Sequence, residues 1–79
     1  MSEYNHNLKI MTRFEKNNLK VRILKLAALK STGSPSELAS RLDISERSVK
    51  RIVSEIREGG HEIRYCLVRR SYVTEKEYQ

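Results

Sequence analysis

The sequence predicts a mostly α-helical fold that ends in a small β-hairpin. Apolar residues recur at helical spacing along much of the chain, and two of these stretches begin with a serine placed as an N-cap. Residues 61–65 alternate and residues 72–74 are β-prone, which is typical of paired strands. At 79 residues the chain has the length of one domain, near the lower size limit for a core without disulfides or metal.

The first helix is predicted within residues 8–30. Thr12 and Glu15 have the spacing of a capping box, and a start at Asn17 or Asn18 is the alternative. One apolar stripe of this helix has the spacing of a core-facing side. It consists of Leu19, Ile23, Leu26 and Ala27.

A second stripe on the same helix has a heptad-like spacing. Its members are Ile10, Phe14, Asn17, Val21, Leu24 and Ala28. A polar residue within such a seam, here Asn17, can set the register of two paired helices. Two interpretations stay open: the stripe is the interface of a homodimer, or the C-terminal strands of the same chain cover it.

Residues 34–42 predict a second, short helix. Ser34 is a good N-cap, Pro35 suits the first helical position, and Glu37 completes a capping box. The apolar edge of the helix is formed by Leu38, Ala39 and Leu42. Residues 43–44 then form a tight turn.

A third helix is predicted from Ser45 to residue 58. Ile44 and Val49 flank Ser45 at the spacing of a hydrophobic staple, and Gly59 is expected to take a left-handed conformation at the C-terminal end. The core stripe of this helix consists of Val49, Ile52, Val53 and Ile56. These residues fall at helical spacing on one side.

The opposite side of this third helix is polar and basic. It carries Arg47, Arg51 and Ser54, with Lys50 and Ser48 at its edges. A helix with an apolar back and this front is built like a reader of the DNA major groove. The alternative is an ordinary amphipathic helix whose charged face is only solvated.

The C-terminal part predicts a hairpin. Ile63 and Tyr65 fall on one side of the first strand, Tyr72 begins the second β-prone run, and residues 66–71 connect them, with arginines near the tip. Residues 31–33 are expected to be a short break. The predicted domain spans residues 8–74, between a flexible N-terminus (1–7) and a flexible acidic tail (75–79).

Composition narrows the range of functions. The net charge of +6 and the sequence pI near 9.8 favour a polyanionic partner. One cysteine, Cys66, excludes an internal disulfide and a cysteine zinc site, and His6 and His61 are isolated. No metal, cofactor or small-molecule site, no catalytic constellation and no membrane span is expected. We therefore expect a cytoplasmic protein without enzymatic activity.

Three helices and a basic hairpin, in this order, resemble the winged helix-turn-helix domain. The segments that carry the resemblance are TGSPSELASRLDISERSVKRIVSEIREGG, EIRY and RRSYV. They are similar to the N-terminal domain of the biotin-operon repressor/biotin ligase and of DeoR-type transcription regulators. The resemblance implies that Ser45, Arg47, Ser48, Lys50 and Arg51 face the major groove or nearby phosphates, and that Arg64, Arg69 and Arg70 are contacts of the wing, which is the hairpin.

The wing departs from the family pattern at residues 66–68, Cys-Leu-Val, which are more apolar than usual. This favours packing of the wing against Phe14, Val21 or Leu24, or against a partner chain, with Cys66 as a small core residue. The expected function is sequence-specific binding of double-stranded DNA by a homodimeric transcription regulator, through residues 45–58 and the wing. The alternative is a protein-interaction module that uses the apolar faces of the first helix and the wing.

Overall fold

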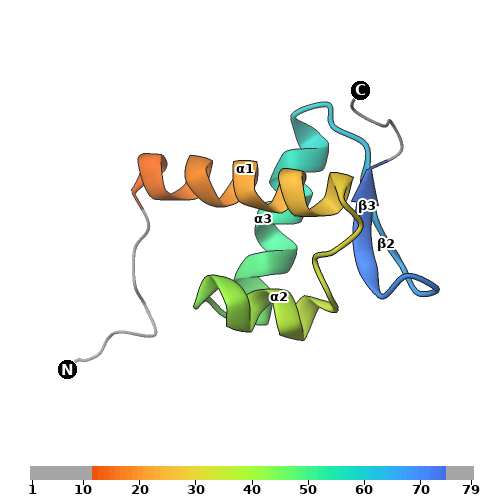
Figure 1. The fold of residues 1–79 in the computed structure, drawn as a ribbon. Helices are drawn as coiled ribbons and strands as arrows, with labels where there is room; N and C mark the ends of the chain where they lie inside the picture. Colours follow the sequence, from red (N-terminus) through yellow and green to blue (C-terminus); the bar gives the residue numbers. More distant parts are fainter. Residues whose placement is uncertain (1–11, 75–79) are drawn as a thin grey trace.

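The computed structural model describes residues 12–74, which form three helices followed by an antiparallel hairpin (Figure 1). The elements are α1 (Arg13–Ala28), α2 (Pro35–Leu42), α3 (Glu46–Glu58), β2 (Ile63–Cys66) and β3 (Ser71–Thr74). The predicted fold class, mostly helical with a small hairpin, is confirmed for this part of the chain, and the layout is compatible with a winged helix. The predictions for residues 1–7 and 75–79 lie outside the described residues.

Helix α1 begins at the predicted capping box. The Thr12 hydroxyl accepts from the N–H of Glu15 at 3.1 Å, and the Glu15 carboxylate accepts from the N–H of Thr12 at 3.0 Å. The alternative start at Asn17 or Asn18 is therefore wrong. Four residues of the helix face the core as predicted: Ile23 and Ala27 are fully buried, and Leu19 and Leu26 pack against them.

The segment from α2 to α3 folds as its caps predict. Ser34 and Glu37 exchange both capping-box hydrogen bonds, at 2.8 and 3.1 Å. Asp43 then takes a left-handed conformation, φ 60°, which reverses the chain after α2. Ser45 caps α3 by accepting from the N–H of Ser48 at 3.0 Å. These local contacts fix the angle at which α3 leaves the turn.

The end of α3 differs from the prediction by one residue. Gly59 has φ −79°, and its N–H still donates to the carbonyls of Glu55 and Ile56. Gly60 takes the positive φ, +103°. The reversal comes later because Gly59 still continues the helical hydrogen bonding, so the left-handed position falls on Gly60.

The core lies between α3, α1 and the elements that pack against these two helices. The predicted stripe of α3 is fully buried, with each of Val49, Ile52, Val53 and Ile56 at most 3% exposed. It meets α2, α1 and β2, while α1 also packs on β3. Burial of these four side chains fixes the rotation of α3, so its polar face is turned outward.

The break between α1 and α2 takes the place of a third strand. Cys66 pairs with Ser71 and Tyr65 with Tyr72, and the backbone N–H of Tyr72 donates to the Thr32 hydroxyl at 2.7 Å. The N–H of Thr32 in turn donates to the hydroxyl of Ser71 at 2.9 Å. Both hydroxyl side chains are fully buried, so this connection holds β3 against the body of the domain.

The hairpin is also fixed to the end of α3. Arg57 donates from Nε and Nη2 to the carbonyl of Ile63, at 3.1 and 2.9 Å. Tyr65 and Tyr72 stack edge to face across the strands, with ring centroids 5.3 Å apart. In Figure 1 the hairpin therefore stands beside the C-terminal end of α1, and its turn points towards the half of the molecule that holds α2.

Candidate nucleic-acid interface

The outer face of α3 carries the predicted basic side chains in solvent. Arg47, Lys50, Arg51 and Ser54 are exposed, and Ser48 is half-buried. Because the opposite side of the helix is buried, these side chains share one accessible surface. The structure thus groups all the predicted α3 residues, and the helix face they form can enter a groove of about 12 Å width, as the DNA major groove is.

The serines at the start of α3 form its N-terminal cap. Ser45 Oγ accepts from the N–H of Ser48 and donates to Ser48 Oγ at 2.9 Å. The hydroxyl proton of Ser48 has no acceptor among the described residues, so it can be donated to an incoming group. The first N–H groups of the helix, with the positive end of its dipole, favour an anion at the same place.

The charges on α3 are not all equal. Lys50 Nζ lies 3.4 Å from a carboxylate oxygen of Glu46, one helical turn away, and both side chains are mostly solvated. A surface pair of this kind contributes at most about 1 kcal/mol. Arg47 and Arg51 form no ion pair with any acid in residues 12–74. These two guanidinium groups therefore keep their donors for an external acceptor.

The three wing arginines also lie at the surface. Arg64 is exposed on β2, and Arg69 and Arg70 are exposed in the turn between the strands. Arg70 is held at φ 53°, and its N–H donates to the carbonyl of Leu67 at 3.2 Å. The hairpin from residue 63 to 74 contains no acidic residue, so its charge is uniformly positive.

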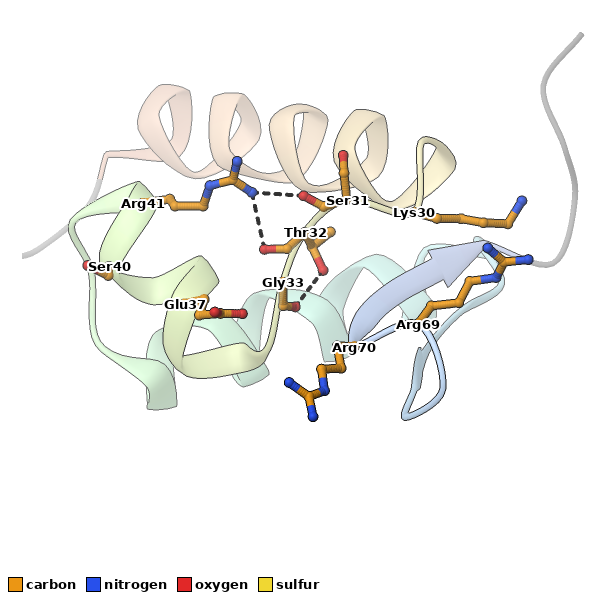
Figure 2. A pocket seen from close by; sticks show the side chains of 9 residues that line it. All are labelled: Lys30, Ser31, Thr32, Gly33, Glu37, Ser40, Arg41, Arg69 and Arg70. Atoms are coloured by element: carbon orange, nitrogen blue, oxygen red, sulfur yellow. Dashed lines mark hydrogen bonds between the residues drawn. The ribbon is translucent and has the colours of Figure 1, made fainter.

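A cleft of about 560 Å³ continues this basic surface between the wing turn and α2 (Figure 2). The cationic residues that line it are Lys30, Arg41, Arg69 and Arg70, beside the single carboxylate of Glu37. Arg41 donates to the carbonyls of Ser31 and Thr32, at 2.8 and 3.4 Å, which are neutral acceptors. Figure 2 shows the side chains spread along the cleft instead of converging on one point. This arrangement suits an extended polyanion better than a single small anion.

Sequence reasoning missed Lys30 and Arg41. Neither residue lies on α3 or on the wing: Lys30 follows α1 and Arg41 lies on α2, and the sequence predicted no ligand contact for these segments. They reach the basic surface because Thr32 is tied to Ser71, which brings the connection after α1 against the wing. No local pattern in the sequence indicates that contact.

The second stripe of α1 is largely uncovered. Phe14 is 73% exposed and Val21 50%, while Asn17 is also exposed and Leu24 and Ala28 are half-buried. Ile10 lies outside the described residues. Covering by the strands of the same chain is therefore wrong for Phe14 and Val21. A groove of about 530 Å³ runs along this side of the helix, lined by Val21, Leu24, Lys25, Ala28 and Leu29.

The apolar wing turn does not pack against α1 either. Leu67 is 81% exposed and Val68 92%. Cys66 is half-buried at the end of β2, outside the core. Hydrogen bonds from the backbone N–H groups of Arg69 and Val68 lower the pKa of its thiol. The predicted packing of Leu67 and Val68 on α1 fails because the short turn extends beyond the strands and away from the helix.

Residues 12–74 were also searched for metal-binding clusters and for membrane-spanning helices. They contain no cluster of three or more histidine, cysteine or acidic side chains that could hold a metal ion. None of the described helices has the length and hydropathy of a membrane span. Comparison of the chain with protein-family models, curated proteins and solved structures found no match.

Proposed function

We propose that this chain binds double-stranded DNA sequence-specifically, with α3 in the major groove and the basic wing on the adjacent backbone or minor groove. The observation that supports this best is the two-sided construction of α3. Four apolar side chains on one side are buried, and Arg47 and Arg51 on the other are exposed without an acidic partner among the described residues. Two guanidinium groups without an acidic partner remain available to an external acceptor.

The chemistry of the face fits base reading. Arginine can donate two parallel hydrogen bonds to guanine O6 and N7, and one such pair contributes about 1–3 kcal/mol of discrimination. Ser54 can donate to, or accept from, a base edge farther along the helix. Arg69 and Arg70, with the cleft lined by Lys30 and Arg41, supply charges for the phosphate backbone, which positions the protein and carries no sequence information.

We propose transcription regulation as the biological output, with a second copy of the chain on the outer face of α1. A single small module buries about 600–1,000 Å² of its own surface on DNA, so two half-sites raise both affinity and specificity. In Figure 1 α1 crosses the upper half of the molecule, whereas α2 and the turn of the hairpin lie in the lower half. Phe14 and Val21 are exposed, so a pair formed through them and the adjoining groove would join the reading faces of two chains.

The test is selection of duplexes from a randomised pool, followed by fluorescence anisotropy at several salt concentrations. Arg47→Ala/Arg51→Ala should lose the selected sequence preference. Arg13→Ala/Arg22→Ala removes the same two charges from α1 and should keep it. Arg69→Ala should weaken all duplexes alike and flatten the salt slope by about 0.9 for each lost phosphate contact. An α3 double variant that selects the same duplexes as its α1 control would exclude base reading by α3.

A second candidate function, a protein-interaction module, is favoured by the open apolar groove on α1. Sedimentation of the protein separates the two uses of this face. If a second copy fills the groove, the mass is dimeric and Val21→Glu makes it monomeric, because a carboxylate is placed within the seam. A monomeric parent protein that selects no duplex would favour a different protein as the occupant.

A further inference from the structure

The turn of the wing exposes the two most solvated large apolar side chains in residues 12–74. Leu67 and Val68 are 81% and 92% exposed, compared with 73% for Phe14 on α1 and for Leu29, which follows its last residue. They are adjacent at the tip, since Cys66 and Ser71 are the last paired residues of the two strands. An apolar tip on an otherwise basic hairpin is the feature that the proposed phosphate contacts leave unexplained.

The turn that presents them is tightly held. Arg70 is fixed at φ 53° with its N–H on the carbonyl of Leu67 at 3.2 Å. At the start of β3, directly after the turn, the Ser71 hydroxyl accepts from the N–H of Thr32 at 2.9 Å and lies 3.0 Å from the Thr32 hydroxyl, and both contacts are buried. The tip is therefore held in one conformation and is anchored beside the turn to the body of the domain.

The charges around the tip indicate a polyanion as the partner. Arg69 and Arg70 follow Leu67 and Val68 directly, and Arg64 lies on the strand before them. No acid lies between residues 63 and 74. A second copy of the same wing, or another basic surface, would bring like charges together, whereas the minor groove offers negative potential on both walls.

Apolar side chains flanked by cations have a known physical use in the minor groove. Leucine and similar side chains inserted between base pairs unstack one step and kink the duplex, typically by about 20–90°. Such insertion is easiest at pyrimidine–purine steps, which unstack most readily.

We propose that Leu67, with Val68 beside it, inserts into the minor groove next to the site of α3 and bends the duplex, while Arg69 and Arg70 hold the flanking phosphates. The proposal rests on the proposed DNA binding and adds a mechanical role and a sequence preference to it. The wing would then favour sites with a flexible step, such as TA, at the position of the tip.

The test uses the full chain and a duplex recovered by selection, with fluorophores at its two ends and 2-aminopurine at the step nearest the wing. At saturating protein, energy transfer between the ends should rise and the 2-aminopurine emission should increase. Leu67→Ser/Val68→Ser should bind the duplex but leave both signals at the level of free DNA. Leu67→Met keeps a long apolar side chain and should keep both signals.

The possible results separate the two proposals. If no duplex is recovered or bound by the parent protein, the proposed DNA binding fails and the wedge with it. Binding without any change in energy transfer, or a bend that the double serine variant retains, overturns the wedge alone. Loss of the bend in the double serine variant with retained binding, together with a bend that Leu67→Met keeps, supports it.

Discussion

Replacement of Thr32 by valine tests whether the connection between α1 and α2 acts as a third strand. The side chain is fully buried, and its Oγ1 accepts from the N–H of Tyr72 at 2.7 Å and donates to the carbonyl of Gly33 at 2.8 Å. Valine has nearly the same shape but neither a donor nor an acceptor. The substitution therefore removes the hydrogen bonds with almost no change in packing volume.

The expected loss is dominated by the N–H of Tyr72. This group points away from β2, so no other strand can accept it, and a buried donor without a partner costs about 1–3 kcal/mol. The lost bond to Gly33 adds about 1 kcal/mol, and the added methyl group of valine offsets a part of this. We expect Thr32→Val to destabilise the fold by about 2–3 kcal/mol, a large fraction of the total for so small a domain.

Thr32→Ser provides the matched control. It keeps the hydroxyl and removes one methyl group, so the expected cost is about 1 kcal/mol. Urea unfolding followed by far-ultraviolet circular dichroism measures both variants, and Ser36→Ala, an exposed serine on α2, should stay within about 0.5 kcal/mol of the parent.

The order of the two Thr32 variants decides the outcome. If the serine variant is as unstable as the valine variant, the methyl group matters and the hydroxyl does not. A valine variant within about 0.5 kcal/mol of the parent would also refute the reasoning, because the N–H of Tyr72 would then have found water.

Two further predictions concern α3. Burial raises the pKa of the Glu55 carboxyl, but hydrogen bonds and charges from Lys20 and Lys16, both 3.4 Å away, outweigh it, so the net pKa lies below its usual value. Because the pKa of Glu55 is lower in the folded state than in the unfolded state, the ionised carboxylate stabilises the fold at pH values above its unfolded pKa. This stabilisation is lost as the pH falls through the folded-state pKa. The difference in unfolding free energy between the parent and Glu55→Gln, up to about 1 kcal/mol, should therefore vanish when urea unfolding is measured in acid. After the end of the helix, Gly60→Ala should destabilise the fold by about 1 kcal/mol or more, because Gly60 has a φ of +103°. Gly59→Ala, at φ −79°, should be neutral or slightly stabilising in the same assay. Equal effects of the two substitutions would show that backbone conformation is not the cause.

The helices could be read from the sequence because their signals are local. The capping boxes at Thr12 and Ser34 join residues three apart, so the contacts are complete within one turn of chain. The buried stripe of α3 follows from helical period alone, and it also determines which side carries Arg47 and Arg51. The error at Gly59 is of the same local kind, a shift of one residue at the end of a helix.

The cleft and the brace of the wing could not be read in this way. Thr32 and Ser71 are 39 positions apart, and their hydrogen bonds bring Lys30 and Arg41 to the basic surface of the wing. Nothing in the residues around Thr32 indicates a partner at that distance. The exposure of Leu67 could not be read from the sequence either, because its apolar side chain favoured burial whereas the turn places it in solvent.

By itself, the sequence determined which segments form helices and strands, where α2 and α3 begin, and which face of α3 is polar, because caps and periodicity act within a few residues. Only the tertiary structure decided which surfaces stay open. The uncovered stripe of α1, the four-cation cleft and the exposed tip of the wing depend on how separate elements pack. That packing is set by contacts between distant residues, whose free energies no local pattern contains.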